Sequence, residues 1–167
     1  SITCVLVSSL GLHCGLSDAL FEKSFSPAVR IITSPELFTA SSEAKFALDC
    51  NKRQCNYFCS LSAGEDEMQR DKNTFTACSD ELQYPGLTEG GYEFSVYATD
   101  ASELKSPTVS YRWVIDQTAP QTEIDPTFNG FVNTATKGLS FSCLDRSPCT
   151  YRCFVDGTEQ PNCGSPL

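Results

Sequence analysis

The chain has 167 residues, of which 40% are hydrophobic and 11% aromatic, so it can bury a substantial core. Its formal net charge of -9 disfavours nucleic acid and anionic lipid as partners, because both are bound through clustered Lys and Arg. A mean hydropathy of -0.21 and the lack of a long uncharged apolar run argue against a membrane span in this segment.

The sequence contains ten cysteines, an even number that indicates disulfides and an oxidising, extracellular or cell-surface environment. The alternative is a zinc site. The spacings after Cys50 and Cys143, however, lack the paired C-x-x-C motifs of common zinc modules. Disulfides are therefore the favoured interpretation, and no cofactor is expected apart from the calcium considered below.

The N-terminal segment, residues 1–26, contains an apolar stretch with Cys4, Cys14 and the only histidine, His13. It resembles a signal-peptide core but has no basic residues before it. We therefore interpret it as a processed extracellular segment closed by a Cys4–Cys14 disulfide, and leave it unassigned to a domain. A Ser–His–Asp or Cys–His pair would have to use His13, and no Gly-rich phosphate loop occurs, so the chain is predicted not to be an enzyme.

The next part of the chain, residues 27–119, is predicted to be all-β, with short strands separated by Pro, Gly, Ser and Asp turns. Strands are expected near 29–33, 44–50, 56–61, 74–78, 81–84, 92–99 and 109–116. The last two show strict alternation and so indicate an antiparallel pair with one buried face. This alternation predicts core positions for Tyr92, Phe94 and Trp113, and it favours a core role for Trp113 over ligand stacking.

The residues that enter the first of these two strands, 87–94, match a tyrosine corner. In that motif the hydroxyl of Tyr92 would bond to backbone a few residues upstream. The alternative is an ordinary half-buried tyrosine.

The cysteine spacing reveals an internal repeat, in which four cysteines of one copy correspond to four of a second. The corresponding positions are Cys50 with Cys143, Cys55 with Cys149, Cys59 with Cys153, and Cys78 with Cys163. These pairs are separated by 93, 94, 94 and 85 residues, and Pro27 and Pro120 are also separated by 93. Such a period equals one immunoglobulin-like sandwich, so 27–119 is predicted to be one domain and 120–167 the N-terminal part of a second. The shorter last offset reflects a polar loop, 65–73, that the second copy lacks.

The second copy has no counterpart of residues 92–116. A sandwich without its last two core strands has unpaired edges and an open core. We therefore expect that the chain is a fragment of a longer polypeptide or is completed by another chain. The fragment is favoured, because a tandem array supplies the missing strands by continuing.

Two motifs that occur in this order resemble a known family. Residues 87–100 contain Tyr-x-Phe-x-Val-x-Ala-x-Asp, and residues 111–120 contain Tyr-x-Trp-x-Ile-Asp-x-Thr-Ala-Pro. Together they are similar to the tandem Ig-like, or fibronectin-III-like, repeats of large bacterial and protist surface and adhesion proteins. The resemblance covers about residues 27–167. Two departures are the extra pair Cys50 and Cys55, with its copy, and Ala-Ser-Glu at 101–103 in place of Gly-Asn.

The resemblance also implies how the cysteines pair. The family hairpin suggests the disulfides Cys59–Cys78 and Cys153–Cys163, each between neighbouring strands. This leaves Cys50–Cys55 and Cys143–Cys149 as small loops at a strand end. A disulfide loop of this kind typically stabilises a fold by roughly 2–4 kcal/mol. Because the cysteines lie close together, other pairings remain open.

Two aspartates that end strands, Asp100 and Asp116, are candidate calcium ligands. Some Ig-like and cadherin-like arrays bind calcium through carboxylates at their linkers, and this ion takes six to eight oxygen ligands. The two aspartates are expected near opposite ends of their hairpin unless the strands are staggered. The alternative, that both aspartates cap turns, is favoured.

By resemblance, the chain is expected to be a structural and adhesive extracellular module, acting as a spacer or filament subunit in a tandem array. Its partners would be neighbouring repeats or copies of itself, reached through exposed strand edges or linker faces. The alternative is a recognition module that binds glycan or protein through the loops 65–73 and 101–107.

Overall fold

The computed structural model describes residues 26–64, 74–125, 138–161 and 163–165. These residues form an all-β fold with strands and no helix. None of the described residues therefore belongs to a helix that could cross a membrane. The N-terminal segment with Cys4, His13 and Cys14, and the loop 65–73, lie outside the described residues.

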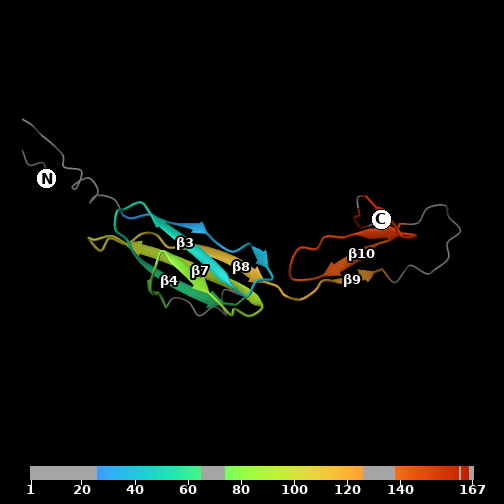
Figure 1. Cartoon of the computed structure of the whole chain (residues 1–167), viewed down its shortest axis with the longest axis horizontal. Coiled ribbons are helices and arrows are strands. Elements are labelled where there is room, and N and C mark those ends of the chain that lie inside the picture. Colours follow the sequence, from blue (N-terminus) through green and yellow to red (C-terminus); the bar gives the residue numbers. More distant parts are fainter. Residues whose placement is uncertain (1–25, 65–73, 126–137, 162, 166–167) are drawn as a thin grey trace, which may run out of the picture.

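Two sheets make up the larger part of the structure, which we call the core region (Figure 1). One sheet has the order β1-β3-β6, with β1 Val29–Thr33, β3 Ala44–Cys50 and β6 Glu81–Tyr84. The other has the order β2-β8-β7-β4-β5, with β2 Phe38–Thr39, β8 Val109–Ile115, β7 Gly90–Thr99, β4 Asn56–Ala63 and β5 Thr76–Cys78. All pairs are antiparallel except β2 with β8.

The core lies between these sheets and contains the aromatic residues that the alternation predicts. Phe46 from β3 stacks on Phe94 from β7 at 4.1 Å between ring centroids, and its edge meets Trp113 at 5.4 Å. Trp113 is only 1% exposed, so it is a core residue and not a stacking surface for a ligand. Full burial of a large apolar side chain stabilises a fold by about 1.5–3 kcal/mol, so this cluster holds the two sheets together.

The β7–β8 hairpin confirms the predicted antiparallel pair. Tyr92 pairs with Trp113 and Phe94 with Tyr111 in its register. From Tyr92 onward every second residue of β7 is buried, and the residues between them are partly exposed. The predicted strands near 56–61 and 92–99 are longer in the structure, and the one near 74–78 is shorter.

Sequence reasoning missed β2, which consists of Phe38 and Thr39 only. It runs parallel to β8, with Phe38 opposite Val114. Two residues are too few to show an alternating pattern, and the partner of β2 lies far along the chain. The contact is made by backbone groups, such as the Val114 N–H that donates to the Leu37 carbonyl at 2.9 Å.

The described residues from 120 onward form the C-terminal region, with two hairpin-like pairs. These strands are β9 Gln121–Ile124, β10 Phe141–Leu144, β11 Cys153–Val155 and β12 Thr158–Gln160. Figure 1 shows this region beyond one end of the core region, joined to it through the segment after β8.

The pairing of β9 with β10 repeats that of β1 with β3 over three consecutive pairs. Three pairs in β1–β3 are Val29–Cys50, Arg30–Asp49 and Ile31–Leu48. The pairs in β9–β10 that follow when 93 is added to every number are Thr122–Cys143, Glu123–Ser142 and Ile124–Phe141. The β11–β12 hairpin matches β4–β5 less closely. In β4–β5, Cys59 is paired with Thr76, which lies two residues before its disulfide partner Cys78. In β11–β12, Cys153 is paired with Gln160, which lies three residues before its disulfide partner Cys163.

Apolar side chains of the C-terminal region are more exposed than their counterparts. Ile124 is 58% and Val155 49% exposed. Leu48, the counterpart of Phe141, is buried beneath the five-stranded sheet of the core region.

The described residues contain four disulfides, which indicate an oxidising environment. They join Cys50 to Cys55, Cys59 to Cys78, Cys143 to Cys149, and Cys153 to Cys163. These are the pairs that the family resemblance implies. Cys59 is buried in the core, so the Cys59–Cys78 bond also links β4 and β5 beside the aromatic cluster.

Candidate functional site

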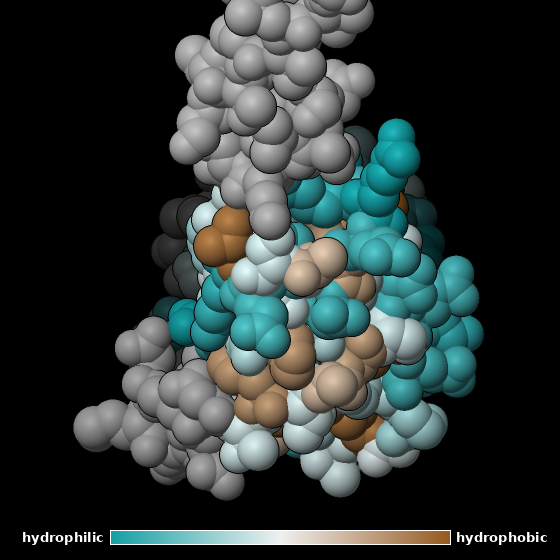
Figure 2. All heavy atoms as spheres, turned by 90° about the vertical axis from the view of Figure 1, so that its left-hand side faces the viewer, coloured by the Kyte–Doolittle hydropathy of each residue, from teal (hydrophilic) through white to brown (hydrophobic). Residues whose placement is uncertain are grey.

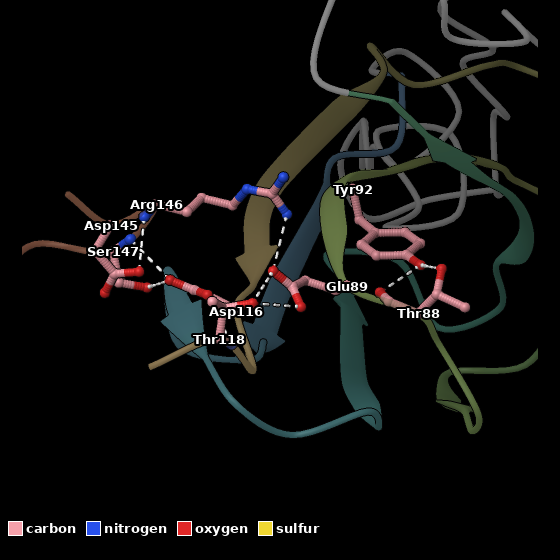
Figure 3. A network of polar contacts seen from close by, with 8 residues as sticks. All are labelled: Thr88, Glu89, Tyr92, Asp116, Thr118, Asp145, Arg146 and Ser147. Carbon is pink, nitrogen blue, oxygen red and sulfur yellow. Dashed lines mark hydrogen bonds and ion pairs between the residues drawn. The ribbon is translucent and has the colours of Figure 1, made fainter. Parts of the chain in front are cut away.

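Two carboxylates, Glu89 and Asp116, lie at one end of the five-stranded sheet. The register of the β7–β8 hairpin brings them there, because Gly90 is opposite Ile115. Glu89 precedes β7 and Asp116 follows β8, so both side chains leave the sheet at the end from which the C-terminal region continues (Figure 3).

A tyrosine corner holds the turn that carries Glu89. The Tyr92 hydroxyl donates to the Thr88 carbonyl at 2.9 Å, and it also lies 3.2 Å from the Thr88 hydroxyl. Tyr92 is buried at the same time, and its ring stacks on Trp113. The predicted corner is therefore confirmed, and it connects the position of Glu89 to the core (Figure 3).

Among the described residues, Arg146 and Ser147 of the C-terminal region contact this acidic end. Ser147 donates its N–H to Asp116 Oδ2 at 2.8 Å and its hydroxyl to the same oxygen at 2.5 Å. Arg146 Nη1 lies 3.5 Å from Glu89 Oε1. Both residues belong to the loop closed by the Cys143–Cys149 disulfide, so a covalent bridge limits the conformations of the loop that makes the contact.

The connecting segment adds to this network. The Thr118 N–H donates to Asp116 Oδ1 at 3.2 Å, and the Thr118 hydroxyl donates to Glu89 at 2.9 Å. We call these five residues, Glu89, Asp116, Thr118, Arg146 and Ser147, the junction (Figure 3). Their contacts link the end of β8, the turn before β7 and the Cys143–Cys149 loop.

The environment of Asp116 favours its charged form. The hydroxyl of Ser147 is the largest cause that lowers the pKa of Asp116, and burial of the carboxylate opposes it. The N–H groups of Thr118 and Ser147 and the charge of Arg146 lower the pKa further. Hydrogen bonds to a carboxylate are charge-assisted and stronger than those between neutral groups, so ionised Asp116 holds the loop in place.

The two candidate calcium ligands lie at opposite ends of the β7–β8 hairpin. Asp100 Oδ1 accepts the N–H groups of Ser102 at 2.8 Å and Leu104 at 3.1 Å. Both aspartates thus accept backbone N–H groups of turns, the role that the sequence favours for them. Within the described ranges, no group of three or more His, Cys, Asp or Glu side chains is arranged to hold a metal.

The loop 101–107 is anchored to its hairpin. The buried Ser106 hydroxyl accepts the Ala98 N–H at 2.9 Å and donates to the Pro107 carbonyl at 2.8 Å. Lys105 Nζ lies 3.7 Å from the centre of the Tyr97 ring. Recognition through 101–107 and 65–73 stays a prediction.

Sequence reasoning singled out Asp116 but missed its partners. Arg146 and Ser147 lie in a short polar loop whose residue types are common in turns, and Glu89 is one of many acidic residues. One signal was present. Arg146 and Arg53 differ by 93 positions, the offset of the cysteines that precede them, so an arginine recurs inside both small disulfide loops.

Comparisons with protein-family models, with curated proteins and with solved structures gave no match for this chain.

Proposed function

We propose that the chain is a structural and adhesive module of an extracellular or cell-surface assembly, part of a tandem array of Ig-like units that acts as a spacer or filament subunit. The observation that carries this proposal is the repeated strand register. The pairs in β9–β10 correspond to those in β1–β3 at an offset of 93 residues, beside cysteines with the same spacing. A duplicated sequence that also pairs in the same register supports an array of similar units.

The junction supports a mechanical role within such an array. A spacer transmits force and holds its length only if adjacent units keep a preferred orientation. Here the short segment 117–120 is reinforced by hydrogen bonds from Ser147 to Asp116 and by the contact of Arg146 with Glu89. Pro120 adds stiffness, because its ring fixes one backbone angle. The proposal assigns no catalytic role to the chain.

Electron microscopy of the native source material tests this function. An antibody raised against the core region would be labelled with gold and applied to isolated cell surfaces and extracellular fibres. The proposal expects labels along fibres, sheets or stalks, at positions that are regular along the structure. Labels confined to dispersed single particles would contradict it.

A further inference from the structure

The loop that makes the junction has a counterpart at the other end of the core region. The Cys143–Cys149 loop presents Arg146 to Glu89, and the Cys50–Cys55 loop carries Arg53 at the equivalent position. The strand before each loop pairs in the same register, so the two loops leave equivalent sites of the fold.

The Cys50–Cys55 loop lies at the opposite end of the core region from Glu89 and Asp116. Asn56, which follows it, pairs with Thr99 at the far end of β7, whereas Glu89 precedes the first residue of that strand. Figure 2 looks at the core region from the side of Figure 1 opposite the C-terminal region, and hydrophilic side chains cover much of the described surface there.

The chemistry of this loop suits an acidic partner. Arg53 is exposed, and with Lys52 and Gln54 it lines a polar cleft of about 630 Å³. The carboxylate of Asp49 also lines the cleft, but it accepts a hydrogen bond from Arg30 at 2.6 Å. Asp80 lies on the cleft wall as well. An arginine beside an amide group can bind a carboxylate through several N–H donors.

We propose that the Cys50–Cys55 loop is a docking surface for the carboxylate-bearing end of another unit of this kind, with Arg53 placed against a glutamate as Arg146 is placed against Glu89. The inference rests on the proposed function, since it requires units in tandem. The partner is a unit joined in series before the core region. Its end would present two carboxylates spaced like those of Glu89 and Asp116.

The tandem arrangement matters for the strength of the contact. A single partly exposed ion pair stabilises a complex only weakly between separate molecules. A short linker, however, holds two sites at an effective concentration in the millimolar range. The docking is therefore expected between linked units and is expected to be weak between free chains.

A carbodiimide cross-link can test the contact, because this reagent joins a lysine amine to a carboxylate that touches it. In the full chain, Arg146→Lys places an amine next to Glu89. A cross-link between this amine and Glu89, found by mass spectrometry, would verify the existing junction. The matched control is Arg152→Lys, whose site faces Glu159 and lies outside the junction.

The proposal itself is tested in a full chain in which residues 27–119 are present twice in series. The second copy carries Arg53→Lys. We expect a cross-link between this lysine and Glu89 of the first copy, at a yield within about threefold of that for Arg146→Lys. Replacing Glu89 of the first copy with Gln should abolish it.

The outcomes separate this inference from the proposed function. If Arg146→Lys cross-links to Glu89 but the duplicated chain gives no equivalent product, the docking surface is wrong and the junction stands. If neither chain gives the product, the junction that supports the array is wrong as well, and the inference falls with it.

A second measurement does not depend on the duplicated chain. Arg146→Glu together with Ser147→Ala replaces the ion pair with Glu89 by a repulsion and removes the hydroxyl bond to Asp116, so the C-terminal loop is released from the acidic end. The chain that combines Arg53→Lys with these two substitutions would be prepared as an isotopically mixed sample at millimolar concentration. It should then form cross-links between the lysine introduced at position 53 of one molecule and Glu89 of another. An absence of mixed-isotope products at that concentration would overturn the docking surface.

Discussion

At the residue scale, one hydroxyl connects the core to the junction. Tyr92 donates to the Thr88 carbonyl at 2.9 Å, and this bond holds the turn in which Glu89 lies. The substitution Tyr92→Phe should lower the free energy of unfolding by about 0.5–1.5 kcal/mol, since it removes this part-buried hydrogen bond. Urea denaturation followed by tryptophan fluorescence measures this loss.

Thr88→Ala is the matched control for the corner. It removes the threonine hydroxyl, 3.2 Å from the Tyr92 oxygen, but keeps the carbonyl that accepts the main bond. It should therefore destabilise the protein less than Tyr92→Phe. The reverse order would mean that the corner depends on the side chain of Thr88 and not on its backbone.

The ionisation of Asp116 gives a second prediction at this scale. Its pKa is lowered in the folded chain, chiefly by the Ser147 hydroxyl. Because the pKa of Asp116 is lower in the folded chain than in the unfolded chain, its ionised form stabilises the fold. This stabilisation is fully present at pH values above the pKa of the unfolded chain, and it is lost as the pH falls through the pKa of the folded chain. The amide proton of Ser147, followed by NMR, should titrate with a midpoint below the ordinary 3.8 of an aspartate.

The same titration in Asp116→Asn identifies the group that is responsible. The amide of Ser147 should lose this transition, because asparagine does not ionise. A midpoint at or above 3.8 in the unmodified chain would contradict the assignment of Asp116 as the charged acceptor.

At the element scale, the two faces of the five-stranded sheet differ in what they stabilise. Phe94 on β7 is fully buried against Phe46 of the opposite sheet. Phe58 on the neighbouring strand β4 points to the other face and stacks on Tyr97. Phe94→Ala should cost about 3–5 kcal/mol, a large share of the roughly 5–15 kcal/mol of a typical domain.

Phe58→Ala is the matched control, because it makes the same change on the same sheet. Its cost should be smaller by at least about 1 kcal/mol, since a partly exposed ring loses less apolar contact. Thermal or urea unfolding of both variants measures the difference. Equal losses would indicate that the outer face of the sheet is also covered.

Strand patterns explain what could be predicted at this scale. β7 and β8 were predictable because alternation along residues 92–99 and 109–115 is a local signal that burial of one face requires. β2 was not, because Phe38 and Thr39 form a strand only through backbone groups of β8. The junction was only half predictable. Asp116 ends a strand, but the contact of Ser147 with it depends on how the next hairpin is placed.

At the scale of the whole molecule, the junction contains two kinds of contact with different sensitivity to solvent. The side chains of the Arg146–Glu89 pair are 39% and 35% exposed, and such pairs contribute about 0–1 kcal/mol and are screened by salt. The Ser147 bonds end on Asp116, which is only 7% exposed. Salt should therefore loosen the junction less than removal of the Ser147 hydroxyl does.

This difference can be measured as the spread of distances between the core and C-terminal regions, by pulsed electron paramagnetic resonance with one label in each. The unmodified chain should give a narrow distribution at about pH 7 that changes little between about 0.1 and 1 M salt, where the Debye length falls from about 10 to 3 Å. Ser147→Ala should broaden it at both salt concentrations, whereas Ser142→Ala, in β10 outside the junction, should not. A broad distribution in the unmodified chain would mean that the units are joined flexibly, and the chain could then serve as a tether but not as a stiff spacer.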